Sequence, residues 1–512
     1  MCDQLRADYL SAYGHPRLAT PHIDRLAALG TKFTRCYVQG PVCGPSRMST
    51  YTGRYVMSHG ATWNFVPLPA GECTLGDYLR AGGLRTAVTG KTHAAADIEG
   101  IKRMGLSPDE GRGRLIAEAG FEPFARDDGI VPTEKLEKRS GPYNAFLKAR
   151  DYPGRNPWHD YANSGLGPNG EIASGWYMRN ARLPARVSEP DSETAWTTDR
   201  ALDFIREQGA RPWCLHLSYI KPHWPYIAAA PYHTLFGPED CIAPVRSERE
   251  RDDAHPVYRA FRNHPEGLAF SRDEVRRNVV PAYMGLVRQI DDHMGRLLAF
   301  LEQAGRMKDT MIVFTSDHGD FLGDHWLGEK ELFFEPCVRV PLIVYDPSGN
   351  AVRSATSDAL IESIDLIPTF LEALEQPVPG HVLEGRSFLA VLRGGRAPRR
   401  DAVFSELDYA FYRARRELGI GPREARAVMV RTNDRKLVHY DRFPPQLFDL
   451  SKESHELEDR GTDPGAEPMR KELYGLLFDR MRQRRNRITL ADAEVRERGD
   501  RAEPGGVIVG QW

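Results

Sequence analysis

The sequence predicts an α/β protein built on a large, mostly parallel β-sheet flanked by helices, with a smaller α+β domain at the C-terminus. Short apolar segments typical of strands alternate with helical patterns over roughly the first 380 residues. After that point the strand signals become short and closely spaced. The chain has 512 residues, of which 41% are hydrophobic, which is enough for one large core and a second, smaller one.

The helices are the clearest elements. Residues 20–30 predict a short helix in which Thr20 is the N-cap, Pro21 takes the first helical position and Gly30 ends the helix. Ile23, Leu26 and Ala27 are expected to form its buried stripe. Further helices are predicted after the Cys-Gly-Pro-Ser-Arg run of residues 43–47 and at residues 74–82, 192–208, 273–305 and 364–375.

Four apolar segments of this region are predicted to be strands: residues 86–89, 213–219, 311–315 and 340–345. The segment 311–315 is continuously apolar, which is typical of a strand buried on both faces. Polar residues follow three of these strands, and ligands bind beyond the carboxyl ends of parallel strands. We therefore expect these residues to converge: Lys91, His93, His223, Asp317 and His318.

Residues 97–190 are rich in Gly, Pro and Arg and show little periodicity, so the sequence predicts no order of elements there. A long irregular insert in an α/β enzyme often forms an active-site wall or an oligomer contact.

The C-terminal part begins after about residue 380. Strands are predicted at residues 427–431 and 436–440, on either side of a turn. The apolar residues 507–509 are expected to pack on a neighbouring subunit. We therefore divide the chain into a catalytic domain (1–380), an α+β domain (381–487) and a tail (488–512).

Net charge and cysteine content argue against several classes of protein. The net charge is −2, so no global field favours nucleic acid or an anionic membrane, and an anionic substrate would need local cations. The seven cysteines are scattered, which fits neither a disulfide framework nor a zinc site. Reduced thiols in a cytoplasm are the simpler interpretation. No apolar run reaches transmembrane length, and no signal peptide precedes the first motif.

Asp3 lies at the very start of the sequence, although an α/β enzyme would normally carry a β-strand before a functional residue of this kind. We expect that strand to be missing or reduced to a stub. A longer natural N-terminus, and with it export to the periplasm, therefore stays open.

The acidic motifs suggest a metal site. Asp3, Asp317 and His318, with the amide oxygen of Gln4, offer a reasonable ligand set for a hard divalent ion. Two plainer interpretations stay open, namely Asp317 as a helix cap and Asp3 as a surface acid. The Asp-His-Gly run at residues 317–319 favours the metal site, because it follows a strongly apolar strand.

Basic residues supply the second half of the candidate site. Lys91 and His93 are two positions apart, so in an extended loop both could face one wall of a pocket. The alternatives are a solvated lysine and a hydrogen-bonded core histidine. His223 lies between two prolines, which restricts the backbone and fits either a positioned acid or a structural loop. Lys330 by itself would be taken for a surface lysine.

Cys43 leaves three interpretations open: a buried apolar side chain, a metal ligand, or a thiolate nucleophile at a helix N-terminus. Its place before a helix provides backbone N–H groups and a dipole that favour an anion. Arg47, one turn further on, adds a fixed cation. Together these residues indicate a metal-assisted site for an anionic, tetrahedral ester.

The motifs, in this order along the chain, resemble those of a known family. The Cys-x-Pro-Ser-Arg run at residues 43–47, followed by Thr-Gly-Arg at residues 52–54, is similar to the sulfatase signature. Further matches to that family are residues 3–4, 90–93 and 316–319, His223, Lys330, and the segments 447–450 and 455–457. The chain therefore resembles the formylglycine-dependent sulfatases, a branch of the alkaline phosphatase superfamily, and we expect an alkaline-phosphatase-like fold.

The resemblance implies that a formylglycine-generating enzyme converts Cys43 to formylglycine while the chain is unfolded. One oxygen of the hydrated aldehyde, lying on a divalent metal, would attack sulfur in line. Calcium is the family default, and manganese is the alternative. The implied metal ligands are Asp3, Gln4, Cys43, Asp317 and His318.

The resemblance also assigns roles to the cationic residues. Arg47, Lys91 and Lys330 would neutralise the charge on the ester. His223 would protonate the leaving alcohol, and His93 would take the proton whose loss releases the anion. The implied substrate-binding residues are Asn64, Lys91, His223 and Lys330.

Within the superfamily the chain also resembles phosphonate monoester hydrolases and phosphodiesterases, through residues 3–4 and 64–68 and the segments 216–219 and 230–232. Gln4 and His318 replace the Asp and Asn of the usual sulfatase pattern, which leaves the identity of the metal open. Lys91 and His93 are the sulfatase choice and favour a sulfate ester.

Four functions follow as hypotheses. The first is an arylsulfatase-like sulfuric ester hydrolase, and the second is a phosphonate monoester hydrolase or phosphodiesterase on the same machinery. The third is a catalytically inactive anion-binding protein. The fourth, a cysteine-thiolate hydrolase using Cys43 with His93, leaves Asp3, Asp317 and His318 without a role. By resemblance to its relatives, the chain is expected to form a homo-oligomer, either a dimer or a tetramer.

Overall fold

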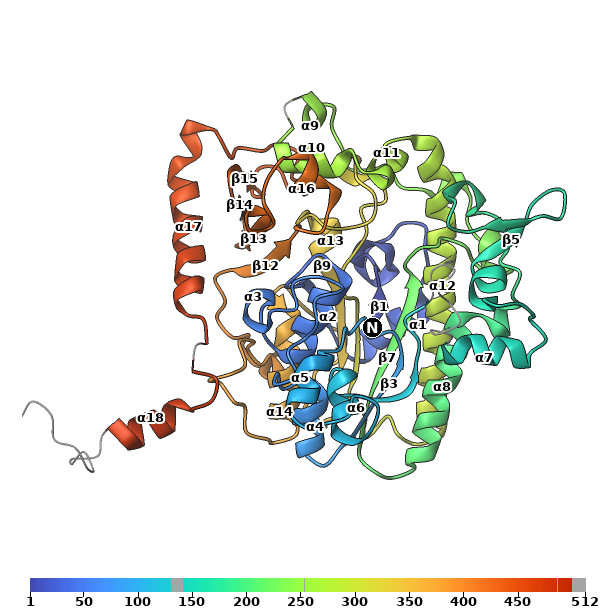
Figure 1. The fold of residues 1–512 in the computed structure, drawn as a ribbon, viewed down its shortest axis with the longest axis horizontal. Coiled ribbons are helices and arrows are strands. Elements are labelled where there is room, and N and C mark those ends of the chain that lie inside the picture. Colours follow the sequence, from blue (N-terminus) through green and yellow to red (C-terminus); the bar gives the residue numbers. More distant parts are fainter. Residues whose placement is uncertain (130–140, 253, 486, 500–512) are drawn as a thin grey trace, which may run out of the picture.

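The computed structural model describes residues 1–129, 141–252, 254–485 and 487–499 (Figure 1). A large β-sheet with helices on both faces forms the main body. A smaller antiparallel sheet with a long helix on its outer side packs against it. The expectation for residues 507–509 lies outside the described residues.

Four parallel strands form one half of the main sheet. In spatial order they are β1 (Cys2–Asp3), β7 (Trp213–Pro222), β3 (Arg85–Gly90) and β4 (Glu122–Arg126). Every strand pair in this half is parallel.

The other half of the main sheet is mixed. In spatial order its strands are β8 (Ile312–Thr315), β9 (Arg339–Tyr345), β2 (Thr31–Tyr37) and β10 (Ala355–Ser357), with β11 (Ile361–Glu362) also paired to β2. A parallel bridge between Cys2 and Ser316 joins the two halves. β9 runs antiparallel to β8 and β2, while β10 and β11 run parallel to β2. Among the described strands the main sheet is therefore mostly parallel, as predicted.

Helices cover both faces of this sheet. One face carries α1 (Pro21–Leu29), α8 (Glu193–Gln208) and α12 (Asp273–Gln303), and the other carries α2 (Cys43–Thr52), α4 (Leu75–Ala81) and α14 (Leu366–Ala373). Side chains alternate across a strand, so Ala87 of β3 packs in one core and Val88 in the other. Within the described residues no helix is both long and apolar enough to cross a membrane.

The predicted helices are confirmed to within about two residues at 20–30, 74–82, 192–208 and 273–305. The predicted helix at 364–375 begins with a 3₁₀ turn at Ser363–Asp365 and continues as α14. Five shorter helices also lie among the first 380 residues: α3 (Val56–His59), α9 (Arg249–Asp252), α10 (Pro256–Arg262), α11 (Pro265–Phe270) and α13 (Glu335–Val338). Another, α15 (Leu389–Leu392), follows them.

The insert at residues 97–190 contains regular elements that the sequence did not predict. They are α5 (Ile98–Arg103), α6 (Gly111–Ala117), β4, α7 (Pro142–Ala149), and the hairpin β5 (Ser164–Leu166) and β6 (Ile172–Ser174). Tyr143 and Trp158 anchor a separate apolar cluster beneath them. The insert thus supplies an edge strand of the main sheet and a protruding hairpin (Figure 1).

The C-terminal region is an antiparallel sheet of β12 (Val403–Asp408), β13 (Arg426–Arg431), β14 (Arg435–Tyr440) and β15 (Phe443–Asp449). Its helices are α16 (Arg413–Glu417), α17 (Glu467–Arg482) and α18 (Asp492–Gly499). The two predicted strands are β13 and β14, and α17 packs on them.

β1 is only two residues long. A cavity lies in the main sheet where a longer strand in line with β1 would run. Within the described chain, residues 213–216 of β7 and 312–315 of β8 are paired on one side only, by β3 and β9. The cavity between these open edges measures about 570 Å³ and is lined by Met1 and by apolar residues of both strands. The amino group of Met1 donates to the carbonyl oxygen of Leu217 (2.8 Å), and burial lowers the pKa of this ammonium.

Candidate active site

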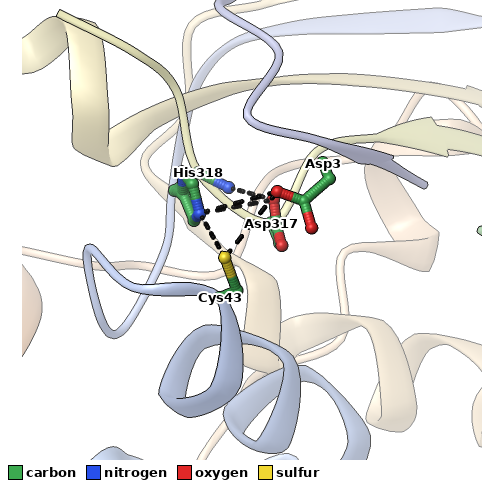
Figure 2. A group of neighbouring side chains, drawn as sticks. All are labelled: Asp3, Cys43, Asp317 and His318. Carbon is green, nitrogen blue, oxygen red and sulfur yellow. Dashed lines mark hydrogen bonds and ion pairs between the residues drawn. The ribbon is translucent and has the colours of Figure 1, made fainter. Parts of the chain in front are cut away.

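The candidate site lies where β1, β3, β7 and β8 end and where α2 begins. Asp3 closes β1, Asp317 and His318 follow β8, and Cys43 is the first residue of α2. One potential ligand atom from each of these four buried side chains lies within 4.8 Å of all the others (Figure 2). Of the five residues expected to converge, Asp317 and His318 belong to this group.

A local hydrogen bond holds the start of α2 against the loop that follows β8. Val42 is extended, and the helix runs from Cys43 with Pro45 in its first turn. The Ser46 hydroxyl donates to the carbonyl oxygen of Asp317 (2.5 Å). The side chain of Cys43 therefore lies at the positive end of the helix, pointing at Asp3 and His318.

The donor set fits a divalent metal ion. His318 Nδ1 is 2.8 Å from the carbonyl oxygen of Gly319, which can only accept, so Nδ1 carries the proton and Nε2 is free to act as a ligand. Nε2 lies 3.1 Å from Cys43 Sγ and 3.9 Å from Asp3 Oδ1. Burial lowers the pKa of His318, but Asp317 and Cys43 outweigh it and the pKa is raised, so a cation at Nε2 is favoured.

Gln4, the remaining predicted ligand, is held differently. Its Nε2 donates to Asp320 Oδ2 (2.6 Å) and to the Tyr226 hydroxyl (3.2 Å), and its Oε1 accepts from Lys330 Nζ (3.0 Å). Its backbone N–H donates to Asp317 Oδ1 (3.1 Å) at a positive φ of 66°. Asp320 and Tyr226 thus fix the orientation of the Gln4 side chain, and its amide oxygen accepts a hydrogen bond from Lys330.

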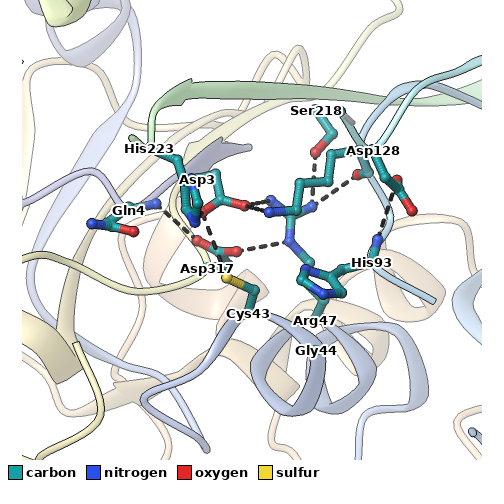
Figure 3. A network of polar contacts seen from close by, with 12 residues as sticks. Asp3, Gln4, Cys43, Gly44, Arg47, His93, Asp128, Ser218, His223 and Asp317 are labelled. Atoms are coloured by element: carbon teal, nitrogen blue, oxygen red, sulfur yellow. Dashed lines mark hydrogen bonds and ion pairs between the residues drawn. The ribbon is translucent and has the colours of Figure 1, made fainter. Parts of the chain in front are cut away.

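Arg47 is buried, and its guanidinium group is directed at the carboxylates of Asp3 and Asp317 (Figure 3). Nε donates to Asp317 Oδ2 (2.7 Å) and Nη2 to Asp3 Oδ2 (3.1 Å). Nη1 donates to the Ser218 hydroxyl (2.8 Å) and to the carbonyl oxygen of Lys91 (2.9 Å). A planar guanidinium with this many partners fixes both carboxylates in one orientation.

Two lysines provide positive charge near Cys43. Lys91 Nζ lies 2.6 Å from Asp3 Oδ2, and Lys330 Nζ donates to His223 Nε2 (3.1 Å). Burial alone would raise the pKa of the Cys43 thiol, but Lys330, Lys91 and His318 bring it well below its usual range. The site therefore favours an anion at position 43.

The structure places the two predicted acid–base histidines differently. His223 Nδ1 is 2.7 Å from the carbonyl oxygen of Trp224, while burial and then Lys330 lower the pKa of His223 to about 4. His93 lies outside the four-donor cluster, at a positive φ of 54°. Its backbone N–H is 3.4 Å from Asp128 Oδ1, and its Nδ1 has no hydrogen-bond partner among the described residues.

Comparisons with known proteins identify the family of the chain. A model of the sulfatase family matches residues 1–376, and a model described as the C-terminal part of N-sulphoglucosamine sulphohydrolase matches residues 323–484. The chain belongs to the sulfatase family. Both the enzyme class and the alkaline-phosphatase-like fold agree with the resemblance seen in the sequence.

This sulfatase is similar to proteins from two branches of the superfamily. It is 31% identical to the multifunctional alkaline phosphatase superfamily protein PehA of Trinickia caryophylli, covering 90% of each chain. It is 26% identical to an arylsulfatase of Clostridium perfringens, covering 89% of this chain and 88% of that protein. Among solved structures it matches the phosphonate monoester hydrolase of Silicibacter pomeroyi, with a TM-score of 0.83, 28% identity and 96% of each chain covered.

The site of this sulfatase includes residues that the sequence did not single out. Ser218, within β7, accepts a hydrogen bond from Arg47, and Asp128 accepts from the backbone of residues 92–93. Asp320 and Tyr226 accept from the side-chain amide of Gln4. Asp320 lies three residues after Asp317, and Tyr226 lies three residues after His223. Their closeness in sequence to predicted site residues could have indicated that they belong to the site.

Asn64, predicted to touch the substrate, lies beside the start of α2. Its Oδ1 accepts from the backbone N–H of Gly44 (2.8 Å). A Cβ atom on Gly44 would come within 2.9 Å of Asn64 Cα, so glycine permits this close approach.

Proposed function

We propose that this sulfatase hydrolyses sulfate monoesters in the manner of an arylsulfatase, through a formylglycine formed at position 43. The observation that carries the proposal is the buried group of Asp3, Cys43, Asp317 and His318, with Lys91 and Lys330 close enough to act on Cys43. Arg47 and Lys91 balance the two carboxylates, so a divalent ion and Lys330 would leave a positive surplus for an anionic ester.

A divalent metal held by Asp3, Asp317, His318 and the modified residue 43, with Gln4 beside it, would lower the pKa of the nucleophile and neutralise charge on the ester. We propose calcium, with manganese as the alternative because of the imidazole ligand. Elemental analysis of purified protein by mass spectrometry identifies the ion.

The residues of the chain would divide the remaining work. Arg47 orients the carboxylates of Asp3 and Asp317. Lys91 and Lys330 neutralise the outer oxygens of the ester, and their positions are fixed before the substrate arrives.

Proton transfer would fall to the two histidines. His223, which accepts from Lys330, would with that lysine protonate the leaving alcohol, because an anionic ester beside it favours the protonated imidazole. His93 would accept the proton that accompanies release of the anion, and Asn64 would contact the substrate.

The burial of Cys43 supports modification before folding. The thiol is almost completely inaccessible, so a formylglycine-generating enzyme would have to act on the unfolded chain. The described cysteines are all free thiols, which is consistent with our proposal of a cytoplasmic location. Cell fractionation tests the location.

We also propose a homo-oligomer, a dimer or tetramer. The hairpin of β5 and β6 exposes the paired side chains of Leu166 and Ile172, and exposed apolar pairs often mark contacts between subunits. Light scattering measures the assembly.

A phosphonate monoester or phosphodiester is the second candidate substrate, because 96% and 94% of the chain superpose on two phosphonate monoester hydrolases. These esters carry the same single negative charge as a sulfate monoester. Lys91 favours the sulfate, which offers one more anionic oxygen for a cation to contact.

The deciding experiment compares 4-nitrophenyl sulfate with 4-nitrophenyl phenylphosphonate, using metal-loaded protein co-expressed with a formylglycine-generating enzyme. A higher kcat/KM for the sulfate is expected, and a dominant phosphonate rate would reverse the choice. Mass spectrometry of the peptide around residue 43 is the second measurement. Full activity with an unmodified thiol would overturn the formylglycine mechanism.

A further inference from the structure

An aromatic rim lies next to the start of α2. The loop of residues 62–66 touches α2 directly, since Asn64 Oδ1 accepts from the N–H of Gly44, the residue that follows Cys43. The next residue, Phe65, leaves 77% of its surface exposed. A large apolar side chain is therefore exposed two residues from Trp63, which is itself almost fully buried.

A second loop, from the C-terminal sheet, completes the rim. The ring of Phe411 stacks on Trp63, with centroids 5.8 Å apart and planes inclined by 14°, yet Phe411 remains 59% exposed. The ring of Tyr412 meets Trp63 edge-on at 4.3 Å. The Thr62 hydroxyl donates to Asp408 Oδ2 (2.9 Å), which ties the two loops together.

The second loop is also joined to the cationic side of the site. The Tyr412 hydroxyl donates to Glu331 Oε1 (2.8 Å), and Glu331 directly follows Lys330. The backbone N–H of Glu331 donates to the carbonyl oxygen of Pro41 (3.2 Å), two residues before Cys43. The first loop therefore touches the segment of residues 41–44 directly, and the second is joined to it through Glu331.

We propose that the exposed rings of Phe65 and Phe411, supported by Trp63, bind the apolar, aromatic alcohol portion of the ester substrate. This inference rests on the proposed function, because it names the substrate class of the same site. The anionic head would lie among the buried lysines, while a neutral aryl group would extend outward against the rim. The ring of Phe411 is already held by stacking on Trp63, so it loses little entropy on binding, and each aromatic contact adds affinity.

The test measures binding rather than turnover. In a Cys43→Ala background loaded with calcium, isothermal titration calorimetry compares 4-nitrophenyl sulfate with inorganic sulfate. Phe65→Ala and Phe411→Ala should each weaken binding of the aryl ester by about fivefold, and the double variant by roughly 20-fold. Affinity for inorganic sulfate should change by less than about twofold. Phe478→Ala, which removes an equally exposed ring (61%) on α17, is the matched control.

The outcomes separate the two proposals. If neither sulfate nor the aryl sulfate binds the Cys43→Ala protein although elemental analysis shows that it holds its calcium, the proposed function fails. If the aryl ester binds equally to all variants, or if inorganic sulfate is weakened as much, the rim is not the subsite. Light scattering covers the other use of an exposed aromatic surface. A change from oligomer to monomer in the Phe65→Ala and Phe411→Ala variants would make the rim a subunit contact and overturn the inference.

Discussion

Asp3 is the residue on which the site depends most. Its Oδ2 accepts from Lys91 and Arg47, while its Oδ1 faces Cys43 (3.7 Å) and His318 (3.9 Å). Burial raises the pKa of Asp3, but the cations around it bring the pKa below its usual range, so the carboxylate stays ionised. One side chain thus links the candidate metal ligands to a cation proposed to contact the substrate.

Replacing Lys91 by methionine should separate these two roles. Without the ammonium group the outer oxygens of the ester lose a preorganised partner, and kcat/KM for 4-nitrophenyl sulfate should fall by roughly 100-fold or more. Metal content should stay near that of the wild type, because Arg47 still fixes Asp3 and Asp317. Lys148→Met, at an exposed position of α7, is the control. Loss of metal together with activity would instead make Lys91 a support of the metal site.

A buried acid outside the site predicts a pH effect on stability. Burial, with Glu193 nearby, raises the pKa of Asp127 from 3.8 to about 7, although it accepts from the N–H groups of Gly129 and Tyr143. A raised pKa means that the folded protein binds the proton more tightly than the unfolded chain. Stability from this group is therefore full below pH 3.8 and is lost as the pH rises toward about 7.

Asp127→Asn should remove this dependence. Between about pH 4 and about pH 7 the wild type should lose a few kcal/mol relative to the variant. Thermal melts across this range measure the difference, with Asp401→Asn at an exposed position as the control. Parallel curves for wild type and Asp127→Asn would contradict the assignment.

More of the candidate site residues could be predicted from the sequence than of the residues that hydrogen-bond to them. Asp317 and His318 could be placed because a buried strand precedes them, and Cys43 because a helix follows it. Ser218 could not be assigned, since its contact with Arg47 depends on the register of β7 against β3. The two anchors of Gln4 likewise depend on loops whose path a single sequence does not reveal.

At the scale of elements, periodic segments were predictable and irregular ones were not. β15 was missed because it contains Pro444 and Pro445, which are tolerated where the strand lies at the edge of its sheet. β2 was missed because Lys32, Thr34 and Arg35 interrupt its apolar pattern. The antiparallel direction of β9 could not be predicted from its own residues, because the neighbouring strands set that direction.

The cavity in line with β1 leads to a prediction about an added strand. An extension of about six Val and Ile residues ahead of Met1 would lie between the open edges of β7 and β8. It would replace a buried ammonium by a peptide group and fill apolar space. The extended protein should therefore melt several degrees higher than the original and retain metal more tightly.

A Gly/Ser extension of the same length is the matched control for this experiment. It removes the terminal charge equally but adds no apolar surface. Differential scanning calorimetry compares the three proteins, and chelator titration follows the metal. Equal melting temperatures for the Val/Ile and Gly/Ser extensions would show that the cavity does not accept a strand.

At the scale of the whole molecule, a buried ion pair joins the C-terminal sheet to the catalytic region. Lys436 of β14 lies 2.5 Å from Glu456 and 3.0 Å from Glu335, and donates to the carbonyl oxygen of Phe333 (2.9 Å). Glu456 accepts in turn from the N–H of Glu335 at the start of α13 (2.8 Å). Phe333 is three residues from Lys330, so the C-terminal sheet holds the loop that carries a cation of the site.

Breaking this pair should therefore affect both stability and catalysis. Lys436→Met leaves Glu456 without its buried cation, while Glu335 keeps Arg339 and Arg431, and should cost about 3 kcal/mol or more in unfolding free energy. The double variant Lys436→Met/Glu456→Gln should cost less than the sum of the two single variants, because the second change removes the uncompensated charge. Denaturant unfolding measures this coupling, and kcat/KM should fall about tenfold as the Lys330 loop loosens.

Lys452→Met, at an exposed position near the end of β15, should change neither quantity. Additive free energies with unchanged kcat/KM would mean that the C-terminal sheet does not position Lys330.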